Sequence, residues 1–227
     1  MHVEIHIPAE VPVMTLPGAV LFPQAIMPLY IFEPRYQAML QDVLASSRLF
    51  AVGGLDEERA QSASQFEPLF PTATLGLVRI CRSHEDGTAN LAIQGLARVR
   101  VNRIVSEEPY RVISVTPLLS HPGGKPKELD TLRAHLSDLI DDRLRCNPEI
   151  PEDFLDFLHG IDDPDIFIDL TAHSLCGDLP VKQRLLETLD TATRLRVFTS
   201  WLAQRNREDL LLDELGAHLD EDDVYLN

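Results

Sequence analysis

The chain of 227 residues has few cysteines and no long apolar run. Its three cysteines, Cys81, Cys146 and Cys176, are far apart in the sequence and odd in number. We therefore expect free thiols, and neither a disulfide framework nor a zinc site. No apolar segment approaches the roughly 20 residues that span a bilayer. Since we find no secretion signal either, the sequence predicts a soluble, cytoplasmic protein.

Basic residues are also scarce. The chain has 20 lysines and arginines against 36 aspartates and glutamates, which gives a formal net charge of −16. Nucleic-acid binding depends on Lys and Arg that neutralise phosphates, and anionic membranes likewise attract basic segments. We therefore expect neither a nucleic-acid partner nor a membrane partner. Hydrophobic residues make up 44% of the chain, which is sufficient for one or two domains with a real core.

Short apolar runs broken by prolines dominate the first half, which predicts a β-rich domain. Val11–Leu16 and Ile26–Phe32 are expected strands. Because proline cannot donate to a sheet ladder, we expect edge or turn positions for the prolines in this region. These prolines are Pro12, Pro17, Pro23 and Pro28.

A helix is predicted after Phe32. A carboxylate at Glu33 would meet the positive end of the helix dipole, and Pro34 suits the first helical position. Apolar residues then recur at steps of three and four until about Ser46. A strand follows at Leu49–Gly53. Residues 54–71 are polar and have no period, so we expect a long loop, and such loops are commonly functional.

The next segments indicate an antiparallel meander. Thr74–Cys81 and Asn90–Gln94 flank Asp86-Gly87, a dipeptide typical of hairpin turns. Two further strands are expected at Arg98–Val105 and Tyr110–Leu118. Their apolar residues alternate with polar ones, as a half-buried sheet requires.

The sequence HPGGKPK at residues 121–127 predicts a domain boundary, and everything beyond it reads as helical. Asp163-Pro164 and Asp178 are helix start signals. Apolar stripes mark two longer helices, one from Leu132 to Leu144 and one through Leu195, Phe198, Trp201 and Leu202. We therefore predict an α+β protein with a β-rich domain at 1–120, a linker at 121–127, a helical domain at 128–219 and an acidic, frayed tail at 220–227.

Several of these segments together resemble the N-terminal substrate-binding domain of the Lon protease. LPGAVLFPQAIMPLYIFEPRY at Leu16–Tyr36, GLVRI at Gly76–Ile80 and QGLARVRVNRIVSEEPY at Gln94–Tyr110 carry the resemblance in the first half. IDDPDIFIDLTAHSL at Ile161–Leu175 and VKQRLLETLDTATRL at Val181–Leu195 are similar to the helical segment that follows in that domain.

The resemblance implies a PUA-like β pseudo-barrel followed by a helical bundle, and a role in capturing unfolded or damaged protein segments. Lon continues into an ATPase module and a Ser-Lys protease. We recognise neither in this sequence, which therefore looks like a stand-alone relative of Lon's recognition domain.

No catalytic, cofactor or metal site is predicted. Gly123-Gly124-Lys125 lacks the glycine spacing of a Walker A loop and is followed by a proline. A Ser-Lys dyad needs a desolvated lysine, and we expect all three lysines (Lys125, Lys127 and Lys182) to be solvated. His84-Glu85-Asp86 lies at the expected hairpin tip, where three consecutive side chains do not converge on one ion. The sequence therefore predicts a protein that is not an enzyme.

Arginines on the expected sheet leave two interpretations. Arg98 and Arg100 share a strand face, with Arg103 and Arg111 nearby, and a PUA-like fold suggests RNA binding. No aromatic platform lies among these arginines, however, and Glu107 follows closely, so cross-strand ion pairing is the favoured interpretation. Glu33 and Arg35 are likewise expected to cap the helix and to pair locally.

Aromatic residues are the best candidates for contacts with a ligand. Phe22, Tyr30, Phe32 and Tyr36 fit either the core or the rim of a shallow groove, where aromatics typically anchor a bound peptide. Phe66, Leu69 and Phe70 are apolar residues in the otherwise polar loop, where they form a lid or pin the loop to the barrel. The candidate peptide-contact residues are Phe22, Tyr30, Phe32, Tyr36, Phe66 and Phe70.

Two functions follow from these patterns. The first is a non-catalytic module whose apolar groove, lined by Ile26–Tyr36 and the long loop, binds unfolded or exposed apolar protein segments. The second is an adaptor or assembly protein that docks on a folded partner, such as a separate ATPase or protease, through the helical half and the acidic tail. The sequence does not assign an oligomeric state.

Overall fold

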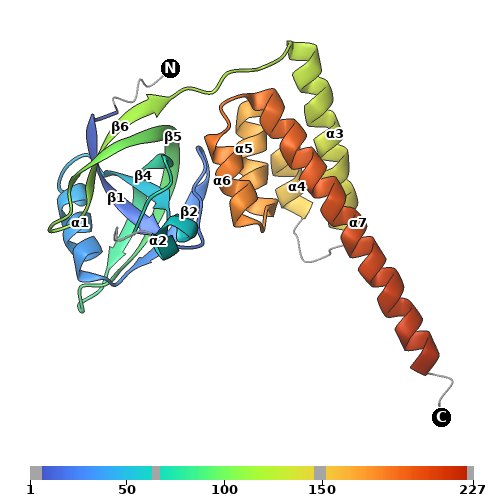
Figure 1. Cartoon of the computed structure of the whole chain (residues 1–227), viewed down its shortest axis with the longest axis horizontal. Helices are drawn as coiled ribbons and strands as arrows, with labels where there is room; N and C mark the ends of the chain where they lie inside the picture. The colour runs from blue at the N-terminus through green and yellow to red at the C-terminus, as the bar shows by residue number, and fades with distance from the viewer. Residues whose placement is uncertain (1–6, 63–66, 146–151, 224–227) are drawn as a thin grey trace. The chain divides into compact units, whose positions relative to one another are not determined.

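The computed structural model describes residues 7–62, 67–145 and 152–223 (Figure 1). Contacts within the chain group the residues into two compact units. One consists of residues 1–121 and 169–189, and the other of residues 122–168 and 190–227. The α+β class is confirmed, with a six-stranded sheet followed by helices. The predicted division into domains at 121–127 stays a prediction.

The first unit is built on a sheet with the strand order β2-β5-β4-β3-β1-β6. Because β5 pairs with β6 as well as with β4, the strands other than β2 close into a ring, which confirms the predicted pseudo-barrel. The second strand, β2, pairs only with β5 within the described chain, so it is an edge strand outside the ring. The strands are β1 (Glu10–Leu16), β2 (Ile26–Ile31), β3 (Leu49–Gly54), β4 (Thr72–Ser83), β5 (Ala89–Ser106) and β6 (Val112–Leu118).

The barrel interior is filled by small and branched apolar side chains. All six residues of β3 are buried, because this strand pairs with β4 on one side and with β1 on the other. The β1–β3 pair is parallel, and helix α1 (Pro34–Leu44) lies in the connection between the two strands. The buried cluster consists of Val11, Val13, Leu49, Ala51, Leu69, Ala73, Leu75, Val99, Ile113 and Val115.

The long strand β5 corrects the predicted meander. We expected two strands, Asn90–Gln94 and Arg98–Val105, but Ala89–Ser106 forms one strand. Its register with β4 shifts beside Gly95, and bulges of this kind bend a strand without ending it. A side chain at Gly95 is excluded, because a Cβ atom there would lie 2.1 Å from the carbonyl oxygen of Phe22. This glycine therefore marks a bend and a close backbone approach, and the predicted break in the strand is wrong.

The prolines of the first strands were predicted only in part. Pro28 lies on the edge strand β2, as expected. Pro12 lies on β1, which is not an edge strand of the sheet, but at Pro12 itself only the pairing with β6 is present, so the residue is locally at an edge. The strand changes partner at this residue, because Pro12 pairs with Val112 of β6 whereas the pairing with β3 begins at Val13.

Residues 54–71 are not an irregular loop throughout. They contain a short helix, α2 (Glu57–Ser62), which begins after Asp56. The Asp56 carboxylate accepts a hydrogen bond from the Arg59 amide at 3.0 Å, as an N-cap residue does. The two ends of the segment pair with each other, since Phe70 N donates to the Gly54 oxygen at 3.1 Å. The helix is too short for a hydrophobic period to reveal it.

Residues 169–189 belong to the barrel unit although they follow the first helices of the other unit. They include most of α5 (Pro164–Leu175) and all of α6 (Leu179–Glu187). The Arg98 guanidinium of β5 donates two hydrogen bonds to the Asp169 carboxylate, at 2.7 and 2.6 Å. A third bond runs from Arg98 Nε to the Leu186 oxygen at 2.9 Å. The predicted cross-strand ion pair is therefore wrong for Arg98, because its ion-pair partner, Asp169, lies on helix α5.

Helices α3 (Pro126–Arg145), α4 (Glu152–His159) and α7 (Thr191–Asp223) form the other unit. The predicted stripes are confirmed, since Leu136, Leu195 and Phe198 are fully buried. The buried Arg194 of α7 pairs with Asp165. The predicted tail at 220–227 is helical through Asp223, and residues 224–227 lie outside the described residues.

Helix starts were predicted well, but one proposed cap was wrong. Pro34 begins α1, and the Asp178 side chain caps α6 by accepting a hydrogen bond from Val181 N at 3.0 Å. Glu33 occupies the N-cap position of α1 but makes no cap hydrogen bond. Its carboxylate pairs instead with Arg35 at 2.8 Å, which confirms the predicted local pairing. Among the described helices, none is long and apolar enough to cross a membrane.

Candidate functional site

An apolar surface lies on the outer face of the sheet at strand β2. Side chains alternate along a strand, so Ile31 points into the core and is 2% exposed, whereas Tyr30 points outward and is 55% exposed. Ile26 and Phe32 share the outward phase and are 60% and 62% exposed. Exposed aromatic and branched side chains in one row are unusual for a surface that meets only water.

The strand register extends this row across two more strands. Pro28 of β2 lies opposite Ala92 of β5, and Ala92 lies opposite Ile80 of β4. Opposed residues in an antiparallel pair share a face, and Ile80 is 68% exposed. We call this surface the sheet face. It consists of Ile26, Pro28, Tyr30, Phe32, Ile80 and Ala92.

Aromatic stacking and a polar rim complete the sheet face. The rings of Tyr30 and Phe32 stack with centroids 6.0 Å apart. At one end Arg79 donates to the Gln94 side chain at 2.7 Å. At the other end the side chains of Asn90 and His84 are 2.9 Å apart. An apolar centre with aromatic residues and a polar border is the usual composition of a protein–protein contact surface.

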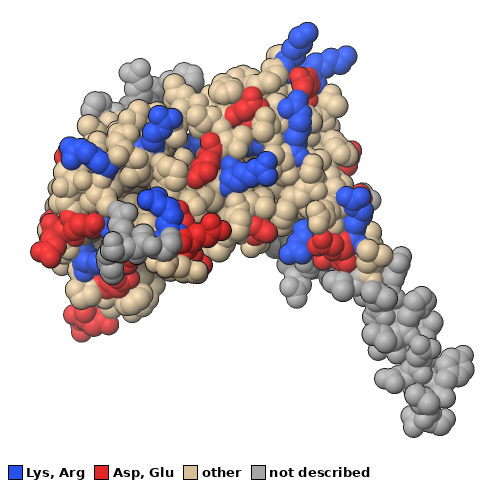
Figure 2. All heavy atoms as spheres, viewed as in Figure 1, with Lys and Arg blue, Asp and Glu red and all other residues tan. Residues whose placement is uncertain are grey.

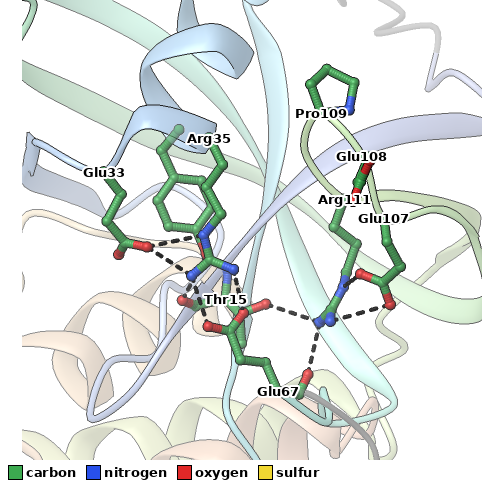
Figure 3. Close-up of a pocket in the computed structure, with 9 residues that line it drawn as sticks. Thr15, Glu33, Arg35, Glu67, Glu107, Glu108, Pro109 and Arg111 are labelled. Carbon is green, nitrogen blue, oxygen red and sulfur yellow. Dashed lines mark hydrogen bonds and ion pairs between the residues drawn. The ribbon is translucent and has the colours of Figure 1, made fainter.

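A cavity of about 680 Å³ lies where α1 meets the end of the 54–71 segment (Figure 3). Arg35 of α1 donates two hydrogen bonds to the Glu67 carboxylate, at 2.8 and 2.7 Å, and one to Glu33 at 2.9 Å. The hydrogen bond from Glu67 raises the pKa of Arg35 further above its ordinary value. Arg35 therefore remains charged and ties the segment to the start of the helix.

The far wall of this cavity is held by a second arginine. Arg111 is buried, and it donates to the Glu107 carboxylate at 2.8 Å and to the Glu67 carbonyl oxygen at 2.7 Å. Beside it the Tyr36 hydroxyl donates to the Thr15 oxygen at 3.3 Å. Burial raises the pKa of Tyr36, so the phenol stays protonated. The cavity lies between the end of the Ile26–Tyr36 segment and the end of the long loop, but charged side chains line it, and the apolar groove stays a prediction.

The predicted contact residues lie in different places. Tyr30 and Phe32 meet on the sheet face, whereas Phe22 is fully buried and Tyr36 is 6% exposed. Phe70 is half-buried and lines another cavity, which α6 also borders. Phe66 lies outside the described residues. Contact with a ligand stays a prediction for all six.

Ile80 was missed as a surface residue, whereas Ile26 was included within the predicted Ile26–Tyr36 groove segment but was not singled out. Both lie in apolar runs. The signal for Ile26 was its even spacing from Tyr30, which places both on the same face of a strand. Nothing in the sequence marked Ile80, because its outward direction depends on the register shift between Val78 and Ile80.

Two of the three residues considered for a metal cluster, His84 and Asp86, have structural partners. The Asp86 carboxylate accepts from the hydroxyl and the amide of Thr88, and these bonds lower the pKa of Asp86. Among the residues that the structure describes, no group of three or more His, Cys, Asp or Glu is placed to hold a metal ion. Neither of the described cysteines, Cys81 and Cys176, forms a disulfide bond, and Cys146 lies outside the described residues.

Lys182 corrects the expectation that all lysines are solvated. Its ammonium group donates to the His173 carbonyl oxygen at 2.8 Å, and burial lowers its pKa. The group faces a backbone oxygen of α5, so this geometry is that of a structural contact between α5 and α6.

The arginines once considered for RNA binding are mostly engaged in ion pairs. Arg98 and Arg111 are buried against carboxylates, and Arg103 lies 3.8 Å from Glu10. On the described part of the face shown in Figure 2, basic side chains are interspersed with acidic ones. The absence of a nucleic-acid partner stays a prediction.

Comparisons with known proteins agree with the fold. Residues 10–204 match the family described as the ATP-dependent protease La (LON) substrate-binding domain. A Lon protease of Syntrophus aciditrophicus is 30% identical over 217 residues, which cover 94% of this chain and 27% of that protein. A Lon protease of Desulfosudis oleivorans is 28% identical and is covered to 26%. The chain thus spans about a quarter of the length of these relatives.

Two solved structures share the fold. The N-terminal domain of the Mycobacterium avium complex Lon protease superposes with a TM-score of 0.69 at 17% identity, covering 86% of this chain and 98% of that domain. A Lon N-terminal domain protein from Xanthomonas campestris superposes with a TM-score of 0.60 at 20% identity, covering 85% and 98%.

Proposed function

Because the chain belongs to the family of Lon substrate-binding domains, we propose that it is a recognition module that binds exposed apolar segments of other polypeptides on the sheet face. The observation that carries this proposal is the exposed row of Ile26, Tyr30 and Phe32 along the edge strand β2 and the residue after it. Burial of apolar surface contributes about 25 cal/mol per Å², and ordering the bound segment offsets part of it. Binding would therefore be weak and tolerant of sequence.

Side-chain contacts, rather than the addition of a strand, would provide the affinity. An open sheet edge ordinarily invites an extended peptide to pair with it. Pro28 lies in the middle of β2 and has no N–H group, which makes this edge a poor template for pairing. The sheet face beside it offers apolar area that needs no backbone register. This mode suits unfolded segments of varied sequence.

The test uses a fluorescein-labelled, uncharged peptide rich in leucine and phenylalanine, with fluorescence anisotropy as the measurement. The double variant Tyr30→Ser, Phe32→Ser should bind at least about tenfold more weakly, because aromatic anchors commonly carry more than 1 kcal/mol each. Since both residues are exposed, its urea midpoint should match that of the wild type. Leu119→Ser is the matched control, because Leu119 is 82% exposed and lies outside the sheet face. Equal affinities for all three proteins would refute the proposal.

A backbone N-methylated copy of the peptide tests the binding mode. Methylation removes the N–H groups that strand pairing needs and leaves the side chains in place. We expect the affinity to change by less than about threefold, since hydrogen bonds at an edge would contribute more than that. A complete loss of binding would instead show that the peptide adds to β2 as a strand.

An adaptor that docks on a folded partner, such as a separate ATPase or protease, is the second candidate. Leu210 and Leu211 on α7 are 53% and 58% exposed, and they favour a contact there. The double variant Leu210→Ser, Leu211→Ser should then abolish capture of the partner, whereas the sheet-face variant should retain it. The expected cytoplasmic location stays a prediction.

A further inference from the structure

A second cavity of about 490 Å³ lies within the barrel unit, away from the sheet face. It is bordered by the turn after β1, the end of β3, the α2 region and the first turns of α6. No residue of the sheet face lines it. Its apolar lining residues include Leu16, Val20, Leu55, Phe70, Leu179 and Pro180.

The lining also contains a buried acceptor without a donor. Gln183 is 5% exposed, and its Nε2 donates to the Thr72 oxygen at 3.2 Å and to the Glu187 carboxylate at 2.8 Å. These two acceptors fix the direction of the amide, because the reverse orientation would place oxygen against oxygen. Gln183 Oε1 has no hydrogen-bond partner. A buried carbonyl oxygen left in this state is costly unless a donor reaches it.

Glycine at position 54 brings the backbone close to this oxygen. Gly54 also lines the cavity, and a Cβ atom at Gly54 would lie 3.4 Å from Gln183 Oε1 and 3.1 Å from the Phe70 ring. Both distances are short for a carbon atom, so Gly54, Phe70 and Gln183 pack closely at the wall of the cavity. An N–H donor next to Phe70 would reach Gln183 Oε1 after a small shift of the Phe70 ring.

The border of the cavity is acidic. Its lining residues carry four carboxylates and one guanidinium, that of Arg184. One carboxylate, Asp56, also lies 3.8 Å from Arg59. A negative border around an apolar floor attracts a group that is both cationic and apolar. The four acidic residues are Asp56, Glu57, Glu58 and Glu187.

We infer that this cavity is a docking site for a basic segment of another polypeptide, in which a leucine-sized side chain lies next to lysine or arginine. The apolar side chain packs between Phe70 and Leu179, and an N–H group of the segment donates to Gln183 Oε1. The lysine or arginine lies among the carboxylates of the border. This site goes beyond the proposed function, because its ligand is charged and its surface is separate from the sheet face.

The test uses a labelled peptide of alternating leucine and lysine, and fluorescence anisotropy with the full chain. Glu57→Lys should weaken binding at least about fivefold, since one charge of the border is reversed. Glu85→Lys is the matched control, because it makes the same change in net charge at the exposed β4–β5 turn. The control should bind like the wild type. Salt at about 0.5 M should weaken binding to the wild type strongly.

A second variant separates the apolar contact from the charge. Leu179 is 38% exposed, so Leu179→Ser should leave the urea midpoint nearly unchanged. It should weaken binding of the leucine–lysine peptide at least about fivefold, because an apolar contact is lost. The sheet-face variant Tyr30→Ser, Phe32→Ser should bind this peptide like the wild type, although it binds the uncharged peptide more weakly.

Three results would overturn the inference. The first is a wild-type protein that does not bind the leucine–lysine peptide. The second is an equal loss of affinity for this peptide in Glu57→Lys and Glu85→Lys. The third is a loss of affinity for the leucine–lysine peptide in the sheet-face variant, which would mean that both peptides bind at one site. Because the uncharged peptide reports on the sheet face alone, failure of either proposal is recognised separately.

Discussion

At the scale of single residues, Arg98 shows how one side chain can join two distant segments. It lies on β5, it is 2% exposed, and it contacts Asp169 and the Leu186 oxygen at the other end of the sequence. A buried charge is tolerated only with a well-placed partner and filled hydrogen bonds. Both conditions hold here, so the pair specifies where α5 and α6 dock on the barrel.

Replacing Asp169 tests this pair. Asp169→Leu leaves the Arg98 guanidinium buried without a carboxylate, and we expect the free energy of unfolding to fall by about 3–5 kcal/mol. Urea unfolding followed by circular dichroism measures the change. Glu10→Leu is the control, because it removes the exposed partner of Arg103, where an ion pair contributes about 0–1 kcal/mol. Similar losses in the two variants would contradict a special role for the buried pair.

His173 gives the barrel unit a dependence on pH. Burial lowers the pKa of His173 from its ordinary value of 6.5, and the Lys182 charge lowers it further, while hydrogen bonds with the backbone of Val20 and Ile26 act in the other direction. A lowered pKa means that the unfolded chain binds the proton more readily than the folded one. The stability that His173 contributes is therefore complete above pH 6.5 and is lost as pH falls through the folded pKa.

Urea midpoints measured between pH 7.5 and pH 5 check this dependence. We expect His173→Gln to show a smaller decrease over this range than the wild type, whatever its absolute stability. His84→Gln is the control, since His84 lies exposed near the β4–β5 turn. If His173→Gln and the wild type lose stability in parallel, the titration of His173 is not the cause.

At the scale of elements, proline and aspartate were reliable where the local chain decides the outcome. Pro34 and Pro164 begin helices at the predicted residues, and Asp178 caps α6. These signals depend on dihedral angles and on bonds within one turn, so a sequence window contains all the information. The bend of β5 at Gly95 depends instead on the backbone of Phe22, far earlier in the chain, so the same window could not reveal it.

The two N-cap positions allow a direct comparison. Asp178→Ala should lower the free energy of unfolding by about 1 kcal/mol, because the Val181 amide loses its acceptor. Glu33→Ala should cost less than about 0.5 kcal/mol, since Glu33 makes no cap bond and its ion pair with Arg35 is partly exposed. Thermal unfolding of the two variants under one buffer condition measures both. A larger loss for Glu33→Ala would show that its pairing with Arg35 matters more than the cap.

At the scale of the whole molecule, the barrel unit is discontinuous in sequence. Residues 169–189 complete it after a helical segment that belongs to the other unit. Besides the Arg98 bonds, Gln183 of α6 donates to the Thr72 oxygen, and His121 N donates to the Leu189 oxygen at 3.0 Å. A division at the linker therefore separates groups that the structure pairs within one unit.

Truncation tests this discontinuity. A chain of residues 1–121 should be unstable or aggregate, because Arg98 would remain in the barrel wall without Asp169 and the surface under α6 would be exposed. A chain of residues 1–189 should remain folded at the barrel. Dispersion of amide signals in a ¹H–¹⁵N NMR spectrum distinguishes the two. A well-dispersed spectrum for residues 1–121 would show that the strands fold without the α5–α6 segment.

The candidate site was predictable only in its aromatic half. Tyr30 and Phe32 were named from the sequence because they are two apart in an apolar run next to a helix start. Their neighbour Ile80 comes from another strand, and the register shift in β4 decides its direction. Tyr36 and Phe22 had the same sequence character, yet packing against the barrel buried them.

The sequence alone determined the α+β class, the starts of α1, α5 and α6, and the family, because propensities, caps and motifs are properties of short segments. Only the tertiary structure decided which apolar residues face water, that β5 is continuous, and that Arg98 pairs with a helix rather than a strand. Those outcomes depend on contacts between residues far apart in the chain. The geometry of such contacts is fixed by register, by close backbone approach and by the cost of burying an unpaired charge.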